Sequence, residues 1–296
     1  MIKKLFFSII LKDTVKELII VSRLNWKNKV YKCITKDYTL SIKVFTNKLK
    51  GKDRYKNEFY FYNLFNHKRI ITTPRIVYSK NYLLFSVLIT NWVEGQSLKT
   101  LINEKGINDN TKYIEEMFKD LHKIWNLKIN DFNKYSNNNF YNKCNKSIDY
   151  VIDKLTKKRK ELNNLYNKVY KIYLELNSKC SFNYNNIINT DISVHEFIIG
   201  KKKNTWLDFE SFSYGDINND LAGVFYSISN SFIKEIKSIK TIYDIVKKEP
   251  SFDKEKFIYY LIERVLLADF LCKKSIPDKE IEFYLEYIIK KYNLKK

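Results

Sequence analysis

Three carboxylates in the second half of the chain have the spacing of a metal site next to a base. Asp191 and Glu196 precede a short apolar run at residues 197–199, and Asp208 follows a second apolar run at residues 205–207. A glycine- and lysine-containing turn separates the two runs, so we expect a β-hairpin with acidic groups at one mouth. Such a mouth holds a divalent cation and a base together, which is the arrangement that phosphoryl transfer from a nucleotide needs.

The stretch at residues 189–220 resembles the catalytic segment of the aminoglycoside phosphotransferase and choline kinase superfamily, which is related to the protein kinases. That segment carries a catalytic Asp, a metal-binding Asn five residues later, a hairpin, and a metal-binding Asp followed by Phe or an equivalent. The resemblance puts Asp191 at the base position and Asp208 at the metal position. Residues 215–222, Gly-Asp-Ile-Asn-Asn-Asp-Leu-Ala, match the family's Gly-Asp-Pro-x-x-Asp-Leu-Ala apart from Ile217.

Two positions in this segment depart from the family pattern. Asn189 replaces the usual His two residues before the base, and Glu196 replaces the metal-binding Asn. Glutamate still ligates magnesium through oxygen, but its extra negative charge changes the affinity for the metal. These departures support an alternative function, a catalytically reduced relative that binds a nucleotide or a partner.

The N-terminal part of the chain has the two-residue period of β-strands. Polar and apolar residues alternate at 17–23, 30–35 and 38–45, which predicts a three-stranded antiparallel meander. Residues 24–29 would form the turn where a kinase fold has its phosphate-covering loop, although they include no glycine. In the family this loop often ends in Asn-x-hydrophobic-Tyr, and Asn28 begins a similar sequence, so the resemblance implies that Asn28 contacts the nucleotide.

One lysine, Lys43, lies inside the apolar strand predicted at residues 38–45. A buried ammonium needs a partner, whereas a lysine on the wet face of an edge strand does not. The resemblance implies that Lys43 binds the α- and β-phosphates of a nucleotide and pairs with a Glu on the next helix. Glu58 lies in an amphipathic helix predicted at residues 53–65, where the family has that helix.

A strongly apolar strand predicted at residues 82–90 leads into the expected linker between two lobes. Residues 91–98, Asn-Trp-Val-Glu-Gly-Gln-Ser-Leu, resemble the family's acidic-Gly-x-x-Leu sequence before a helix. The resemblance implies that backbone groups of Ile89, Asn91 and Val93 contact the edge of the adenine.

From residue 111 onward the apolar period becomes that of helices. Helices are predicted at 111–124, at 148–176 as one helix or as two with a break, and at 221–233, 257–270 and 280–292. Residues 131–147 have no clear period and are predicted to form an irregular connection. The expected fold is α+β and protein-kinase-like, with a small antiparallel-sheet lobe at 1–92 and a mostly helical lobe at 93–296.

The formal net charge of +21 over 296 residues favours anionic partners. Counterion release would suit nucleic acid, so a basic nucleic-acid-binding module is a second alternative function. However, the basic residues are spread along the chain, and abundant Lys, Asn, Ile and Tyr are typical of an AT-rich genome. The densest run, at residues 157–160, lies in a helical pattern, and we favour a solvated face over a nucleic-acid groove. An anionic substrate or peripheral contact with an anionic membrane surface also fits the charge.

Cysteine spacing and the N-terminal sequence favour the cytoplasm. Four scattered cysteines without Cys-x-x-Cys spacing indicate neither a zinc site nor a disulfide framework. The apolar run before Lys12 resembles a signal peptide only briefly and has no small-residue cleavage site. No stretch is long enough to span a bilayer. The sequence leaves the oligomeric state open.

The resemblance implies a phosphotransferase that uses ATP or GTP with Mg²⁺ and moves the γ-phosphate to a hydroxyl of a small molecule. The acceptor classes are an aminoglycoside, choline, a sugar or a cell-envelope saccharide. Asp191 would accept the hydroxyl proton, and Asp208 with Glu196 would hold magnesium. Lys43, fixed by Glu58, would hold the nucleotide phosphates, and these side chains would share one crevice between the lobes.

Overall fold

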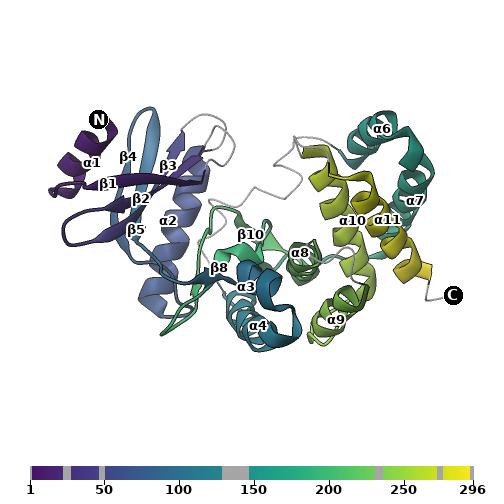
Figure 1. Cartoon of the computed structure of the whole chain (residues 1–296). Coiled ribbons are helices and arrows are strands. Elements are labelled where there is room, and N and C mark those ends of the chain that lie inside the picture. Colours follow the sequence, from purple (N-terminus) through teal and green to yellow (C-terminus); the bar gives the residue numbers. More distant parts are fainter. Residues whose placement is uncertain are drawn as a thin grey trace. The chain divides into compact units, whose positions relative to one another are not determined.

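The computed structural model describes residues 2–22, 28–46, 51–128, 147–230, 236–271 and 276–293. The chain forms two compact units, one of residues 1–98 with 195–211 and one of residues 99–194 with 212–296 (Figure 1). The hairpin segment 195–211 thus belongs to the first unit although it lies late in the sequence. Most of the predicted loop at 24–29 and of the irregular connection at 131–147 lies outside the described residues.

A five-stranded antiparallel sheet forms the centre of the first unit, with the strand order β1-β2-β3-β5-β4. Its strands are β1 (Glu17–Ser22), β2 (Asn28–Ile34), β3 (Thr39–Thr46), β4 (Ile76–Asn81) and β5 (Phe85–Asn91). The first three strands form the predicted meander, and β5 corresponds to the strongly apolar strand predicted at 82–90. Every neighbouring pair is antiparallel.

Two helices, α1 (Ile2–Leu11) and α2 (Gly51–Lys68), cover opposite faces of this sheet (Figure 1). On one face, Phe7 of α1 belongs to an apolar cluster with Ile42 of β3. On the other face, the rings of Phe45 and Tyr55 of α2 lie 5.8 Å apart. Side chains alternate along a strand, so Lys43 points to the same face as Phe45, toward α2.

A small three-stranded sheet completes the first unit, in the order β6-β8-β9. Its strands are β6 (Gln96–Ser97), β8 (Phe197–Ile199) and β9 (Thr205–Trp206). β8 and β9 pair antiparallel and form the predicted hairpin. Gly95 has φ of 145°, and a Cβ there would lie 2.3 Å from the carbonyl oxygen of Ile199. Only glycine allows the segment after β5 to pass so close to the hairpin.

The second unit is mainly helical. It contains α3 (Leu98–Lys105), α4 (Thr111–Trp125), α6 (Ile148–Lys158), α7 (Asn163–Lys179), α8 (Ile217–Ser229), α9 (Ile236–Val246), α10 (Lys254–Leu271) and α11 (Asp278–Asn293), with the antiparallel strands β7 (Asn186–Asn189) and β10 (Phe212–Gly215). The buried helix α10 packs against α6, α7, α8 and α11. No helix in the described part of the chain has the length and apolar character needed to cross a membrane.

The helical segment predicted at residues 148–176 forms two helices, α6 and α7, with a break between them. A short 3₁₀ helix, Lys160–Leu162, separates the two helices. Just before it, the buried Arg159 donates to the carboxylate of Asp269 of α10 at 2.8 Å and to the carbonyl oxygen of Ile276 at 2.6 Å. The buried charge is therefore paired, and it ties the break to α10.

Candidate functional site

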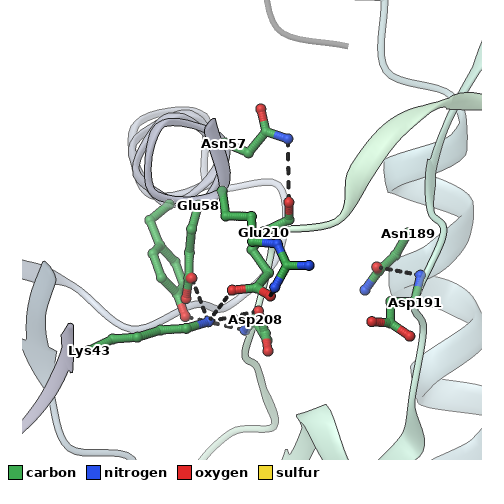
Figure 2. A network of polar contacts seen from close by, with 9 residues as sticks. Lys43, Asn57, Glu58, Asn189, Asp191, Asp208 and Glu210 are labelled. Carbon is green, nitrogen blue, oxygen red and sulfur yellow. Dashed lines mark hydrogen bonds and ion pairs between the residues drawn. The ribbon is translucent and has the colours of Figure 1, made fainter. Parts of the chain in front are cut away.

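Three carboxylates of the first unit surround the ammonium group of Lys43 (Figure 2). Lys43 Nζ lies 2.7 Å from Glu58 Oε2, 2.9 Å from Asp208 Oδ1 and 3.1 Å from Glu210 Oε2. The lysine comes from β3, Glu58 from α2, and the other two from the segment that follows β9. The ion pair that the resemblance implies between Lys43 and Glu58 is therefore present, and Lys43 is a buried, partnered lysine.

Burial and mutual charge shift the protonation of this cluster. Burial raises the pKa of Glu58 to about 8, although the nearby Lys43 charge opposes that shift. Burial alone would lower the pKa of Lys43, but the carboxylates of Asp208, Glu58 and Glu210 raise that pKa well above its usual value. With Arg54 also bound to Glu210, the group has two cations and three carboxylates. When all three carboxylates are ionised, the group has one negative charge in excess, which favours the binding of a cation.

Asp208 is held in a backbone conformation that is rare for a residue with a side chain. Its φ is 58°, in the left-handed region, where strained residues are frequently functional. Its N–H donates to the Tyr62 hydroxyl of α2 at 3.3 Å. The next residue, Phe209, is fully buried, with ring centroids 5.1 Å from Tyr62 and 5.0 Å from Phe65. The packing on α2 thus offsets the local strain and aims the carboxylate at Lys43.

Glu210 and Arg54 belong to this cluster, and the sequence analysis did not place either there. Arg54 Nη1 lies 3.2 Å from Glu210 Oε1, and the Asn57 amide donates to the backbone carbonyl of Glu210 at 3.4 Å (Figure 2). One spacing could have pointed to Arg54, which precedes Glu58 by one helical turn and so lies on the same side of α2. Glu210 follows Asp208 by two residues, but it lies in a turn after a residue with positive φ, so its place in the cluster has no period to predict it.

The hairpin brings the backbone of Glu196 next to Leu207, the residue before Asp208. Leu207 donates its N–H to the carbonyl oxygen of Glu196 at 2.9 Å.

The carboxylate oxygens of Glu58, Asp208 and Glu210 lie within 4.8 Å of one another. Carboxylate oxygens are the hard donors that magnesium prefers, so the donor set in this unit fits that ion.

The residues expected at the adenine edge lie along the end of β5 and in the linker that follows it. Ile89 is fully buried and pairs with Ile42 of β3 and with Tyr78 of β4. The N–H of Asn91 donates to the carbonyl oxygen of Arg75 at 3.1 Å. Val93 lies in the linker, and its backbone makes no hydrogen bond to the backbone of another described residue. Asn28 lies at the start of β2.

The segment with the expected base, Asp191, belongs to the second unit and forms a tight turn after β7. The side-chain oxygen of Asn189 accepts from the N–H of Asp191 at 3.2 Å (Figure 2). The N–H of Ile192 donates to the Asn189 carbonyl at 3.0 Å. This is the local side-chain bond that asparagine makes in turns. Asn189, where the family has His, therefore still fixes the backbone of Asp191, whose side chain is exposed.

Asp220 of α8 braces this turn through hydrogen bonds. One carboxylate oxygen accepts from Trp125 Nε1 at 2.9 Å and from the N–H of Asn189 at 3.2 Å. Burial raises the pKa of Asp220 to about 7, although these donors and the Arg264 charge lower it. Gly223, one turn further along α8, admits Ile192 and the guanidinium of Arg264, because a Cβ there would lie 2.4 and 2.6 Å from them.

Replacing Asp220 with alanine should destabilise the protein by about 2–5 kcal/mol, because two buried donors lose their acceptor. Asp220→Asn keeps one oxygen acceptor and should cost less. The pKa of Asp220 is raised on folding, so its ionisation lowers stability as the pH rises from about 4 through about 7. The stability advantage of wild type over Asp220→Asn should therefore shrink across that range in denaturant titrations. A pH-independent difference between the two would contradict this assignment.

Asp216 has a structural role at the start of α8. It is the N-cap of α8 and accepts from the N–H of Asn218 at 2.9 Å. Its other oxygen accepts from the N–H of Asn183 at 3.0 Å and lies 3.3 Å from Lys256 Nζ. Asp216 therefore fixes the start of α8, the helix that supplies Asp220.

Comparison with solved structures supports the fold. The chain resembles a spectinomycin phosphotransferase solved with ADP and spectinomycin (12% identity, TM-score 0.63, 95% of this chain and 93% of that chain). It also resembles an amicoumacin kinase solved with AMP-PNP and Ca²⁺ (10%, 0.60, 98% and 96%) and a choline kinase from Streptococcus pneumoniae (17%, 0.58, 99% and 98%). No family model and no curated protein sequence matches the chain. The chain has the α+β, protein-kinase-like fold of the aminoglycoside phosphotransferases and choline kinases, which confirms the expected fold.

Proposed function

We propose that this protein transfers the γ-phosphate of ATP or GTP to a hydroxyl group of a small molecule. The observation that carries the proposal is the pair of contacts at Lys43 Nζ, 2.7 Å from Glu58 and 2.9 Å from Asp208. A buried lysine shared by a helix carboxylate and a potential metal ligand suits the binding of nucleotide phosphates. The likeness over nearly the whole chain to kinases of spectinomycin, amicoumacin and choline supports the same reaction class.

Each proposed residue has one role in this reaction. Lys43 binds the α- and β-phosphate oxygens, and Glu58 positions the lysine. Asp208 and Glu196 hold Mg²⁺, which when bound neutralises charge on the phosphates. Asp191 orients the acceptor hydroxyl and accepts its proton, while the Asn189 side chain fixes the turn.

The remaining proposed contacts fix the nucleotide base and the acceptor class. Val93 offers its backbone groups to the adenine edge, next to Ile89 and Asn91, and Asn28 contacts the nucleotide from the start of β2. The acceptor is an alcohol such as an aminoglycoside, choline, a sugar or a cell-envelope saccharide. Since the chain carries a net charge of +21, a neutral or anionic sugar fits as well as a polycation.

Glu196 should function as an oxygen ligand in spite of its unusual side chain. Glu196→Asn restores the residue usual in similar kinases and should keep phosphoryl transfer within about tenfold of wild type. Glu196→Ala removes the oxygen and should reduce the rate by about a hundredfold and raise the Mg²⁺ concentration needed. Rates measured across a Mg²⁺ titration compare the three proteins. If alanine and asparagine variants behave alike, Glu196 does not hold the metal.

The reaction is tested by nucleotide turnover with Mg²⁺ and a panel of small alcohols, in parallel with ATP and GTP. We expect release of nucleoside diphosphate to rise well above the rate without acceptor for at least one alcohol, and to stop when EDTA removes the metal. Nucleotide binding without acceptor-dependent turnover would instead support the alternative of a catalytically reduced, nucleotide-binding relative.

A further inference from the structure

The first unit contains a groove of about 1050 Å³. Of the residues given roles above, it shares only those of the linker after β5. Three segments form its walls: the loop between α2 and β4, the linker after β5, and the turn between β8 and β9. Its volume is at the upper end of the range of small-molecule sites. The groove therefore has room for a ligand of its own.

Hydrogen bonds between the three segments hold the groove open. Trp206 donates its N–H to the carbonyl of Thr72 at 2.9 Å, which joins the hairpin to the α2–β4 loop. The N–H of Asn91 donates to the Arg75 carbonyl at 3.1 Å, and the N–H of Arg75 donates to the Asn91 side chain at 2.5 Å. The Asn66 amide donates to the carbonyl of the residue before Arg75 at 3.0 Å. The site is thus preformed.

The lining of the groove is strongly basic. Lys201, Lys202 and Lys203 of the turn and Arg75 of the opposite loop line it, against the single carboxylate of Glu94. A run of lysines on a turn is ordinarily a solvated surface. Here, however, cations from two segments far apart in the sequence face one groove, and that concentrates positive potential where a ligand would bind.

A buried hydroxyl gives a second, independent indication of a ligand. Thr73 also lines the groove and is 7% exposed, yet its Oγ1 has no hydrogen-bond partner among the described residues. A buried polar group without a partner costs free energy, so such a group calls for an explanation. A ligand oxygen would supply the missing partner. Trp92, half-buried at the linker wall, adds an apolar surface beside these polar groups.

We propose that this groove binds a small anion that carries a chain of phosphate groups, at a site separate from the Lys43 cluster. Lysine ammonium groups bind phosphate as point charges, and a ligand with several phosphate groups suits cations that line two walls. The Thr73 hydroxyl would donate to a phosphate oxygen. None of the residues that line the groove belongs to the Lys43 cluster, and the linker residues Asn91 and Val93 are the ones it shares with the proposed adenine contacts. The inference therefore does not depend on the proposed kinase reaction.

The test is a titration with inorganic tripolyphosphate, followed by the indole N–H resonance of Trp92 in tryptophan-labelled full-length protein. We expect a saturable shift in wild type at low salt. The variant Lys201→Glu/Lys202→Glu/Lys203→Glu should raise the Kd at least tenfold. The matched control Lys158→Glu/Lys168→Glu/Lys171→Glu changes the net charge equally at exposed lysines of the second unit and should leave the Kd within twofold. No saturable shift, or equal weakening by both triple variants, would overturn the site.

Thr73→Val separates binding from folding. The change keeps the shape of the side chain and removes the unpartnered hydroxyl, so the melting temperature should stay the same or rise. The Kd for tripolyphosphate should rise at least threefold. Unchanged affinity would show that the hydroxyl does not contact the anion and would contradict its place in the site.

Discussion

Asp208→Asn is expected to lower the rate of phosphoryl transfer by about a thousandfold or more, because it removes the charged oxygen that would hold the metal on the nucleotide phosphates. The protein should still fold. Lys43 keeps Glu58 and Glu210 as carboxylate partners, and asparagine has the shape of aspartate. Initial rates across a Mg²⁺ titration measure the effect, and the variant should need a higher Mg²⁺ concentration for half-maximal rate.

The matched control for this change is Asp53→Asn, an exposed aspartate in the first turn of α2. It removes the same charge from the same unit and should leave the rate within about twofold, as surface substitutions usually do. Should Asp208→Asn turn over at the wild-type rate with the wild-type Mg²⁺ requirement, Asp208 would not be a metal ligand.

Asp191→Asn is expected to lower kcat by about a hundredfold to ten-thousandfold, the range that a general base contributes. The KM for nucleotide should change little, because the proposed phosphate and metal contacts come from other residues. The bond from the residue-191 N–H to the Asn189 side chain does not involve the carboxylate, so the turn should persist. Steady-state kinetics with a saturating acceptor separates the two parameters.

An exposed aspartate in the same unit, Asp109, provides the control for Asp191. Asp109→Asn should retain wild-type kcat, since nothing assigns Asp109 a part in the reaction. A change of KM alone in Asp191→Asn would point to a binding role in place of proton transfer.

Much of the fold follows from the sequence because period and turn chemistry are local properties. The two-residue alternation gave the meander, and the apolar runs around Gly200 gave the hairpin of β8 and β9. Ile42 and Lys43 illustrate the limit of such patterns. Both are buried, and they face different helices on opposite sides of the sheet. The alternation along the strand does not tell whether the face that carries Lys43 is covered by a helix or exposed to solvent.

Elements that depend on tertiary contacts were missed. For the apolar run before Lys12 we predicted neither an export segment nor a structural element, and it forms α1, which packs Phe7 on the sheet. Strands β7 and β10 have only four residues each, too few for a period to emerge, and they form because they pair with each other.

The candidate site was predictable in part for the same reason. Lys43 could be identified as a candidate because it interrupts an apolar strand, and Glu58 because it lies on the helix that follows. The ion pair of Arg54 and Glu210 forms because two segments far apart in the sequence meet in space. The order of residues in the sequence does not predict that contact. The ion pair of Lys43 and Glu58 is present in the structure. The functional roles of all the predicted site residues, and the shared crevice expected for positions 43, 58, 191 and 208, stay predictions.

The central claim is transfer of a phosphoryl group to a small alcohol, and mass spectrometry tests it most directly. Wild-type protein and Asp191→Asn are each incubated with Mg²⁺, a small-molecule extract and a nucleotide isotopically labelled in its γ-phosphate. The account predicts that at least one hydroxyl compound gains a single labelled phosphoryl group with wild type and almost none with the variant. Label recovered only as inorganic phosphate, or equal labelling by both proteins, would contradict it.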